Sequence, residues 1–355
     1  MGLPYNILDG DFLRKAERTM QNNQSSSNEM VRWGVISTAN IGVKIVSPAI
    51  QASSNGRLMA VGGRDPQRAA ELYGFAPNIR IYGDYESIIN DPDIDAIYIP
   101  LPNSLHAEWT IKALRAGKHV LCEKPLAATV KEAEKMVEAA HANNVLLMEA
   151  FMYRFHPQIV WVLEQVKAGL IGPVRLVRAS FSFDIRSQPE NIRVNPELAG
   201  GSLMDTGCYL VNLCHAVYEQ APQTVTARVH VPKAGGIDMA TNAILDFGDG
   251  RFGLIDSSLE LLRRQGAEII GETGTITIPV PFSPGTIETV VFVMKNGQMR
   301  EQSFPRVDQY QIQVEHFAEC IRSGKEPARP LSETLENMAT VEAIYQSAGH
   351  DWPIV

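Results

Sequence analysis

The chain has 355 residues, of which 45% are hydrophobic and 20% are charged, so it can bury a large core and is not globally disordered. Its length suggests about two domains. The formal net charge of −8 argues against a nucleic-acid-binding or anionic-membrane surface, because such surfaces need concentrated Lys and Arg.

No apolar stretch is as long as a membrane span, and the N-terminal residues lack the apolar segment of a secretory signal. The cysteines are sparse and irregularly spaced, which is typical of reduced thiols and not of a disulfide framework. These residues are Cys122, Cys208, Cys214 and Cys320. We therefore expect a soluble cytoplasmic protein.

Residues 1–30 differ from the rest of the chain. A helix-compatible stretch from Gly10 to Met20 leads into a polar, linker-like run from Gln21 to Asn28. Two interpretations stay open for this segment: a mobile tail, or an ordered arm that packs on a partner subunit or on a cofactor.

Short apolar stretches alternate with helix-compatible ones over residues 31–150. This spacing predicts parallel β-α-β units, and the continuous apolar character of the strands predicts a sheet covered on both faces. We expect a Rossmann domain for dinucleotide binding here. Its predicted strands are Val31–Ile36, Leu58–Gly62, Ile79–Tyr82, Ala96–Ile99, His119–Cys122 and Val145–Met148. Its predicted helices are Ile41–Ala52, Pro66–Tyr73, Tyr85–Asn90, His106–Ala116 and Val130–Asn143.

The pattern changes after a predicted helix over Pro157–Ala168. We expect residues 151–355 to form an α+β domain for substrate binding and oligomerisation, with a large, mostly antiparallel open sheet. Asp249-Gly250 between two strands is a strong hairpin signal. The predicted strands are Val174–Phe183, Val225–Val231, Asn242–Phe247, Gly253–Ser258, Glu268–Gly271, Thr275–Ile278 and Thr289–Met294. The predicted helices are Ser202–Tyr218, Gln309–Arg322 and Ser332–Ser347, the last two packing back toward the first domain.

The turn from Gly34 to Gly42 lies where a dinucleotide fingerprint is expected, between the first strand and the first helix. The marked glycine positions of that fingerprint fall at Ser37, Ala39 and Gly42. Small residues still allow backbone N–H groups to approach a pyrophosphate at a helix N-terminus, although an ordinary strand-to-helix turn is the alternative. The residues predicted to contact the cofactor here are Ser37, Thr38, Ala39, Asn40, Ile41 and Gly42.

The second strand ends in Gly62-Gly63-Arg64-Asp65, with no carboxylate at its tip. Arg64 can pair with a 2′-phosphate and stack on adenine, so Gly63 and Arg64 favour NADP over NAD, which stays possible. Asp65 is the competing residue, because a carboxylate in this region can bind the ribose of NAD. However, Asp65 before Pro66 is also a typical helix N-cap.

Three residues form a candidate catalytic group. Lys124 follows a predicted strand, at the edge where parallel sheets bind ligands. Asp205 and Tyr209 are four residues apart, so a helix places them on one face. Each has a structural alternative: a surface lysine, a capping box between Ser202 and Asp205, and a core tyrosine. A nearby ammonium group would lower the pKa of Tyr209 and make it a proton acceptor.

The chain resembles the Gfo/Idh/MocA oxidoreductases from residue 31 to near its end. The motifs that carry this resemblance are the turn to Gly42, Leu101-Pro102-Asn103 with His106, Ala116-Gly117-Lys118-His119-Val120, Glu123-Lys124-Pro125, and Gly200-Gly201 through Asp205 to Tyr209. The resemblance implies that Lys124 and Tyr209 flank the reacting carbon and that Asp205 orients the substrate or Tyr209. It also implies that Leu101, Pro102, Asn103, His106, Glu123 and Lys124 contact the cofactor.

Tyr209 is similar to one branch of this family, which contains glucose–fructose oxidoreductase, D-xylose dehydrogenase and dimeric dihydrodiol dehydrogenase. The turn Ser37-Thr38-Ala39 and the stretch from Met148 to Pro157 resemble the latter two. Arg154 and His156 in that stretch are candidates for the sugar pocket, with salt bridging and helix capping as the alternatives. The chain departs from the family pattern at Ser37 and Ala39, which replace glycines, and at Gly63 before Arg64.

The expected reaction is hydride transfer between the nicotinamide of NADP and a sugar or polyol carbon that carries a hydroxyl, as in an aldose 1-dehydrogenase. Alternatives are a trans-dihydrodiol dehydrogenase, a ketosugar or anhydrosugar reductase, and a sensor that binds NADP(H) or sugar without turnover. The histidines and cysteines lack metal-ligand spacing, so no metal site is expected. An open sheet leaves unpaired edges or an apolar face, which predicts a homodimer or homotetramer through that sheet.

Overall fold

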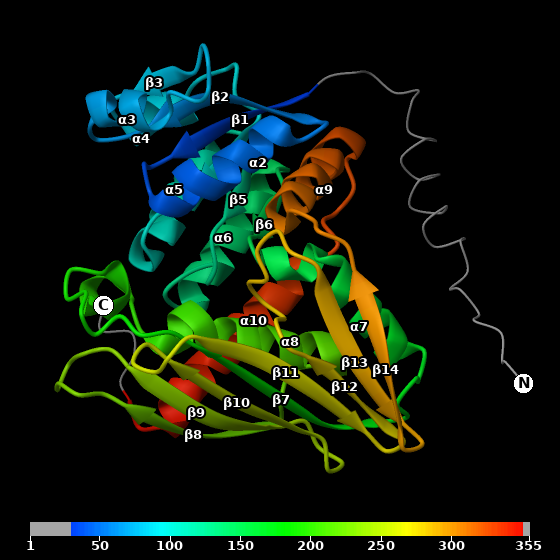
Figure 1. Ribbon diagram of the computed structural model, residues 1–355. Coiled ribbons are helices and arrows are strands. Elements are labelled where there is room, and N and C mark those ends of the chain that lie inside the picture. Colours follow the sequence, from blue (N-terminus) through cyan, green and yellow to red (C-terminus); the bar gives the residue numbers. More distant parts are fainter. Residues whose placement is uncertain (1–29, 351–355) are drawn as a thin grey trace, which may run out of the picture. The chain divides into compact units, whose positions relative to one another are not determined.

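The structure is a computed structural model and describes residues 30–350. The stretch from Gly10 to Met20, and with it the choice between a tail and an arm, lies outside the described residues. From Val31 onward the chain forms one compact unit that contains two β-sheets (Figure 1). The division into domains at residues 150 and 151 stays a prediction.

The first sheet is entirely parallel and has the strand order β3-β2-β1-β4-β5-β6. This is the strand order of a Rossmann sheet, in which the chain changes direction of travel between β1 and β4 and opens a crevice at their carboxyl ends. The central strands are almost fully buried, as predicted from their continuous apolar character. The strands are β1 (Val31–Ile36), β2 (Gly56–Gly62), β3 (Arg80–Tyr82), β4 (Ala96–Ile99), β5 (His119–Cys122) and β6 (Leu147–Glu149).

Helices connect these strands and begin where side chains can cap them. The Asp65 carboxylate accepts a hydrogen bond from the N–H of Arg68, which confirms the predicted N-cap. Thr129 and Glu132 form a capping box at another helix start. The helical segments are η1 (Gly42–Val46) continuing as α2 (Ser47–Ala52), α3 (Pro66–Leu72), α4 (Tyr85–Ile89), α5 (Asn103–Arg115) and α6 (Val130–Asn143).

The second sheet has the strand order β14-β13-β12-β11-β7-β10-β9-β8, and only β7 and β10 pair in parallel. The predicted large, mostly antiparallel sheet is therefore confirmed. Asp249 and Gly250 turn the chain between β9 and β10 with φ values of 54° and 71°, as a tight hairpin requires. The strands are β7 (Val174–Ser182), β8 (Thr224–His230), β9 (Ala240–Asp246), β10 (Phe252–Ser258), β11 (Arg264–Gly271), β12 (Gly274–Ile278), β13 (Thr289–Lys295) and β14 (Gln298–Phe304).

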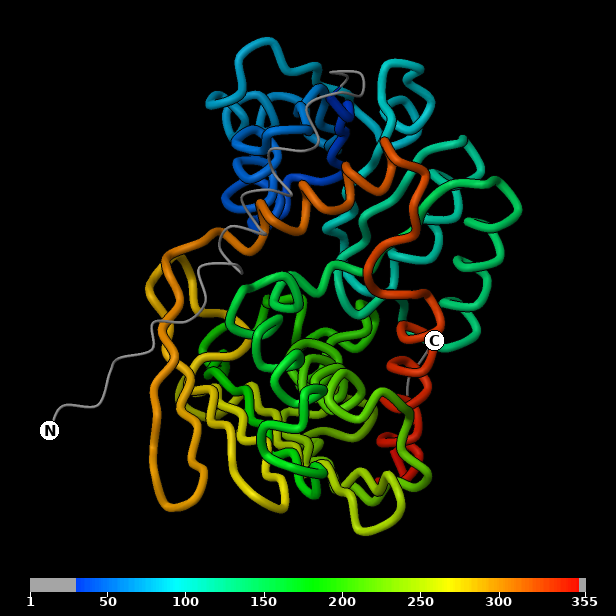
Figure 2. Tube along the Cα trace, turned by 90° about the vertical axis from the view of Figure 1, so that its right-hand side faces the viewer, coloured from blue at the N-terminus to red at the C-terminus, as the bar shows by residue number. Residues whose placement is uncertain are grey.

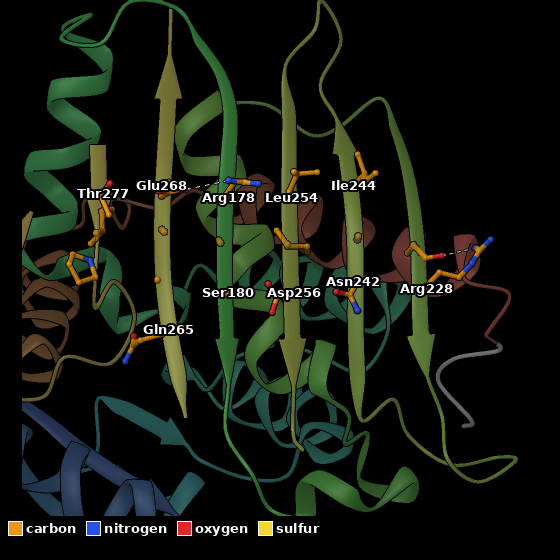
Figure 3. A pocket seen from close by; sticks show the side chains of 18 of the residues that line it. Arg178, Ser180, Arg228, Asn242, Ile244, Leu254, Asp256, Gln265, Glu268 and Thr277 are labelled. Atoms are coloured by element: carbon orange, nitrogen blue, oxygen red, sulfur yellow. Dashed lines mark hydrogen bonds and ion pairs between the residues drawn. The ribbon is translucent and has the colours of Figure 1, made fainter. Parts of the chain in front are cut away.

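Helices cover only one face of this second sheet (Figure 1). They are α7 (Pro157–Lys167), α8 (Cys208–Tyr218) and α10 (Leu331–Ser347). In the described part of the chain no helix packs on the opposite face, and a concavity of about 730 Å³ extends across it. Figure 3 shows this face, from which side chains including Arg178, Ile244 and Asp256 project.

The last two helices of the chain contact the parallel half. Helix α9 (Gln309–Ser323) packs on β1, β2 and α2, and Figure 2 shows it beside those N-terminal elements. The Phe317 ring of α9 lies 5.9 Å from the Trp33 ring of β1. Helix α10 contacts α6 on one side and α8 with β8 on the other.

Some elements differ from the sequence predictions. The helices expected over Ile41–Ala52 and Ser202–Tyr218 begin with π-helical turns, which are η1 and η5 (Leu203–Gly207). Strand β14 was not predicted. The short 3₁₀ segments η2 (Met152–Phe155), η3 (Ile192–Val194) and η4 (Pro196–Leu198) also lie where no periodicity marked an element.

Candidate functional site

A cavity of about 560 Å³ opens at the carboxyl edge of the parallel sheet, where such sheets bind ligands. Its walls come from the turn after β1, the segments after β4 and β5, the loop between β7 and α8, and the helices α8 and α9. The predicted site residues that line it are Ala39, Asn40, Ile41, Leu101, Asn103, Glu123, Lys124, Asp205 and Tyr209. The predicted residues that do not line it are Ser37, Thr38, Gly42, Gly63, Arg64, Pro102, His106, Arg154 and His156.

The turn after β1 lacks two of the usual glycines of a dinucleotide fingerprint, but Ser37 adopts a glycine-like backbone conformation there. Ser37 has a φ of 107°, a conformation that normally favours glycine, and its Oγ accepts a hydrogen bond from the N–H of Ala39 at 3.0 Å. Among the described residues no hydrogen bond occupies the N–H groups of Asn40 and Ile41 at the start of the helix. These donors can bind an anionic group.

The adjoining segment after β2 fits a nucleotide with a phosphate on its ribose. A side chain at Gly63 would place its Cβ 3.3 Å from Thr38 Cγ2, so glycine keeps the two strand ends close. Arg64 is exposed and has no hydrogen-bond or ion-pair partner in the described part of the chain. Because Asp65 is engaged in capping α3, Arg64 is the charged group left at this strand end.

Lys124 and Asp205 form an ion pair inside the cavity. Lys124 Nζ donates hydrogen bonds to Asp205 Oδ1 at 3.0 Å and to the backbone oxygen of Asp205 at 2.8 Å. Asp205 is not part of a capping box, because Ser202 Oγ donates to Asp238 Oδ2 at 2.6 Å. Arg193 Nε donates to the second carboxylate oxygen of Asp205 at 2.8 Å.

This pairing fixes the charge states of the site. Burial opposes ionisation of Asp205, but Arg193 and Lys124 outweigh it and lower the pKa of Asp205 to about 2. Burial likewise opposes the charge on Lys124, and the carboxylate of Asp205 outweighs it, so the pKa of Lys124 is raised. Lys124 is therefore an ammonium and Asp205 a carboxylate at neutral pH.

Tyr209 corrects one expectation, because burial raises its pKa well above 10.0 instead of Lys124 lowering it. Lys124 Nζ lies over the Tyr209 ring, 5.1 Å from its centre. The carboxylate of Asp205 compensates the positive charge of Lys124 there. The Tyr209 hydroxyl donates to Met152 Sδ at 3.4 Å, an acceptor that does not favour the phenolate. Tyr209 thus keeps its proton at neutral pH.

His106, Arg154 and His156 were predicted to contact ligands, but the structure gives them structural contacts. The ring nitrogens of His106, which is fully buried, lie 2.8 Å from the backbone oxygen of Leu101 and 2.9 Å from that of Pro125. Arg154 pairs with Glu333 at 2.6 Å, and His156 caps α7. The contacts of the last two residues match the salt-bridging and capping alternatives, and ligand contact by any of the three stays a prediction.

Several lining residues were missed from the sequence, chiefly in the loop between β7 and α8. This loop contributes Glu190, Asn191, Ile192, Arg193, Leu198 and Gly200. Tyr310 on α9 and Phe183 after β7 also line the cavity. The only signal for the loop was its position just before Gly200-Gly201, because irregular segments carry no periodicity.

Comparisons with known proteins identify the class of protein. Residues 31–151 match the oxidoreductase family with an NAD-binding Rossmann fold, GFO_IDH_MocA, and residues 159–277 match the GFO/IDH/MocA C-terminal domain. The chain therefore belongs to the Gfo/Idh/MocA family and is an oxidoreductase, as the sequence motifs predicted.

Relatives of known activity span nearly the whole chain. A D-xylose 1-dehydrogenase (NADP(+)) from Haloferax volcanii is 36% identical, over 89% of this chain and 97% of the relative. A trans-1,2-dihydrobenzene-1,2-diol dehydrogenase from Xenopus tropicalis is 30% identical, over 91% and 99%. The structure of a 3-ketoreductase from Actinomadura kijaniata with NADP and TDP-benzene has a TM-score of 0.85 and 29% identity, over 90% and 98%.

Proposed function

We propose that this oxidoreductase uses NADP(H) and transfers hydride between the nicotinamide and a sugar or polyol carbon that carries a hydroxyl. The observation that carries the proposal is the group of Lys124, Asp205 and Tyr209 in one cavity with the turn after β1. A D-xylose dehydrogenase named for NADP(+) and a ketoreductase with bound NADP among the relatives support it.

The residues divide the proton chemistry between them. The nicotinamide supplies the hydride acceptor or donor when the cofactor is bound. Tyr209 exchanges a proton with the substrate oxygen, and the Lys124 ammonium donates a hydrogen bond to the same oxygen. Asp205 holds Lys124 in place and keeps it charged. Supporting contacts come from His106, which braces the backbone at Leu101 and Pro125.

A ketosugar reductase is the second candidate, and the state of Tyr209 favours it. Because Tyr209 retains its proton at neutral pH, it is ready to donate that proton to a carbonyl oxygen. Relatives named dTDP-3,4-didehydro-2,6-dideoxy-alpha-D-glucose 3-reductase, 31% identical in Actinomadura kijaniata, act in that direction.

For the cofactor, Arg64 is the residue that would hold the 2′-phosphate, and the N–H groups of Asn40 and Ile41 would face the pyrophosphate. We assign dinucleotide binding to residues 31–150, and substrate binding and oligomerisation to residues 151–355. The uncovered face of the second sheet is the proposed interface of a homodimer or homotetramer (Figure 3).

The cytoplasm is the proposed location, because the four cysteines are all unpaired and buried, which fits a reducing compartment. A separate finding is that no described helix combines the length and apolar character needed to cross a membrane.

The test is a substrate screen in both directions that follows the absorbance of reduced nicotinamide. Aldoses, polyols and dihydrodiols are offered with NADP⁺, and ketosugars with NADPH. Turnover that disappears in Lys124→Met supports the proposal, and the better direction separates the two candidates. Failure of every substrate with both NADP(H) and NAD(H) would refute it.

A further inference from the structure

The loop between β7 and α8 brings a second cation into the cavity. Apart from Lys124, Arg193 is the only Lys or Arg among the described residues that line it. The 3₁₀ segment η3 (Ile192–Val194) carries Arg193, and the side chain is 39% exposed. It is therefore a partly open group that a ligand in the cavity can reach.

The backbone of Arg193 is hydrogen-bonded to the segment just before the helix that carries Asp205 and Tyr209. The N–H of Gly201 donates to the Arg193 oxygen at 2.8 Å, and the N–H of Arg193 donates to Asn191 Oδ1 at 3.1 Å. A Cβ at Gly200 would lie 2.3 Å from the Arg193 oxygen. The loop can pack this closely only because residue 200 is glycine.

The side chain of Arg193 is fixed at one end and available at the other. Its Nε donates to Asp205 Oδ2, while Lys124 uses Oδ1 of the same carboxylate. The guanidinium carbon lies 5.8 Å from the Phe183 ring centre. Within residues 30–350, no protein group accepts a hydrogen bond from the two terminal nitrogens of Arg193. A planar guanidinium held in this way presents a pair of directed donors.

The charges around Arg193 indicate what those donors bind. The lining carboxyl groups are Glu123, Glu190 and Asp205, against the two cations Lys124 and Arg193. Arg193 therefore provides no surplus positive charge for a phosphate or carboxylate ligand. An uncharged ligand oxygen can accept from the terminal nitrogens without any further charge compensation.

We infer that Arg193 determines specificity for an uncharged polyhydroxy substrate by donating hydrogen bonds to a hydroxyl other than the one that reacts. This inference rests on the proposed function, narrows its sugar or polyol substrate to an uncharged one, and names a residue that selects it. Arg193 and Lys124 share one carboxylate, so they can hold neighbouring oxygens of one sugar. Through Asp205, Arg193 also positions Lys124.

The test deletes substrate hydroxyls one at a time and compares Arg193→Met with the wild type. For the wild type, one particular deoxy analogue of the best substrate loses about ten- to a hundredfold in kcat/KM, as for one hydrogen bond to a charged donor. In Arg193→Met the same deletion costs less than about threefold. Arg186→Met is the matched control, because Arg186 lies in the same loop and, among residues 30–350, forms its ion pair with Asp184 alone. In Arg186→Met, kcat/KM is expected to fall with each deoxy analogue as much as in the wild type.

Arg193→Lys provides a second variant in case Arg193→Met does not fold. The lysine keeps a charge beside Asp205 but lacks the fork of donors, so the pH profile of kcat stays as in the wild type and the hydroxyl discrimination is lost. Equal deoxy penalties in the wild type and both variants would overturn the inference. A uronate or sugar phosphate preferred over the neutral sugar, with the preference lost in Arg193→Met, would overturn it as well.

Binding separates failure of this inference from failure of the proposed function. Saturation-transfer NMR measures binding of the neutral sugars to the wild type and Arg193→Met in the presence of NADPH, without turnover. Binding that weakens only in Arg193→Met supports the inference even where no sugar is oxidised. Absence of any sugar binding to the wild type overturns it.

Discussion

At Asp205 one largely buried carboxylate is shared by two cations, with Oδ1 facing Lys124 and Oδ2 facing Arg193. Such groups are stable inside a protein only while they stay paired, and removal of one partner typically costs about 3–5 kcal/mol. Substitutions of Asp205 are therefore expected to change both the free energy of unfolding and the catalytic rate. Substitution of Tyr209 separates the two effects better, since its hydroxyl forms a hydrogen bond only with the sulfur of Met152 among the described residues.

Tyr209→Phe is expected to lower kcat by a factor on the order of 10²–10⁴, the usual contribution of one acid–base group. The free energy of unfolding changes by about 1 kcal/mol or less, because only one weak hydrogen bond is lost. Steady-state kinetics and urea unfolding measure the two effects. Tyr153→Phe is the control: it removes a hydrogen bond to Asn212 but lies outside the cavity, so kcat stays near the wild-type value. Unchanged turnover in Tyr209→Phe would remove Tyr209 from the chemistry.

Arg64→Ala is expected to lower kcat/KM for NADP⁺ about ten- to a hundredfold and to leave the value for NAD⁺ nearly unchanged. The reason is the loss of charge-assisted hydrogen bonds to the 2′-phosphate. Kinetics with both cofactors give the ratio. Arg57→Ala serves as control, because Arg57 is exposed at the opposite end of β2. An NADP⁺ to NAD⁺ ratio that stays constant in Arg64→Ala would contradict the assignment.

Glu149, at the end of β6, contacts both the segment that follows Lys124 and the segment that precedes α10. Its Oε1 accepts a hydrogen bond from the N–H of Leu126 at 3.0 Å, two residues after Lys124. Its Oε2 lies 3.7 Å from a nitrogen of Arg329, just before α10. Burial outweighs this cation and raises the pKa of Glu149 to about 7.

The raised pKa of Glu149 predicts a pH dependence of stability. Between pH 4.5 and about 7 the folded state holds this proton and the unfolded state does not, so stability falls as pH rises through that window. The full effect is on the order of 3 kcal/mol. Urea unfolding at a series of pH values measures it in the wild type and in Glu149→Gln. The difference in free energy of unfolding between the two, wild type minus variant, is expected to decrease from pH 5 to pH 7.5. A difference that is flat with pH would show that Glu149 titrates normally.

The candidate catalytic residues could be predicted because each lies at the end of a predictable element. Lys124 follows β5, and Asp205 with Tyr209 opens a helix after two glycines. Arg193 and Arg154 show the limit of such reasoning. Arg193 lies in an irregular loop without periodicity, and the contact of Arg154 with Glu333 joins residues 179 positions apart.

At the scale of elements, hydrophobic periodicity located most helices and strands but not their fine geometry. Each π-helical segment is a single turn of five residues, too short to change the periodicity of the helix that follows, so η1 and η5 could not be distinguished from α-helix. Strand β14 was missed because it lies at the sheet edge, mostly exposed, and its sequence QMREQSF has no apolar alternation. Its partner β13 was found because its sequence TVVFVMK is a run of apolar, mostly β-branched residues.

Gly200→Ala is expected to displace the loop between β7 and α8 as one element. The new Cβ would lie 2.3 Å from the Arg193 oxygen, so the backbone must move at a cost of about 1–3 kcal/mol. KM for the sugar rises about tenfold or more while the Kd for NADPH stays the same, which titration of NADPH fluorescence can check. Gly74→Ala is the control, since a Cβ there meets only ordinary contacts. Parallel losses of sugar and NADPH binding would instead indicate general unfolding.

At the scale of the whole molecule, the uncovered sheet face predicts self-association. Ile244 on β9 is 46% exposed in the concavity of that face. Ile244→Arg is expected to shift the chain toward a monomer in sedimentation-velocity experiments, because buried charge destabilises an interface. The control is Val160→Arg, since Val160 is also exposed but lies on α7. A wild type that sediments as a monomer at micromolar concentration would contradict the prediction.

The kinds of sheet, parallel in the first half and mostly antiparallel in the second, could be predicted from the sequence, whereas their strand orders were not predicted. We expected α9 to pack back toward the first half of the chain, but not against which strand, because sequence periodicity shows which face of a helix is apolar and not which distant face it will cover. Trp33 is fully buried, and Phe317 of α9 is one of the residues against it.

That contact has a consequence for biosynthesis. Residues 309–323 leave the ribosome long after β1 and β2 have been made, so the face around Trp33 stays uncovered until almost the entire chain has been translated. Domains usually fold during synthesis in order from the N-terminus. In this protein the first half is therefore synthesised first, but its apolar face is covered only when α9 has been made. A nascent chain stalled before residue 309 would expose this apolar surface to chaperones.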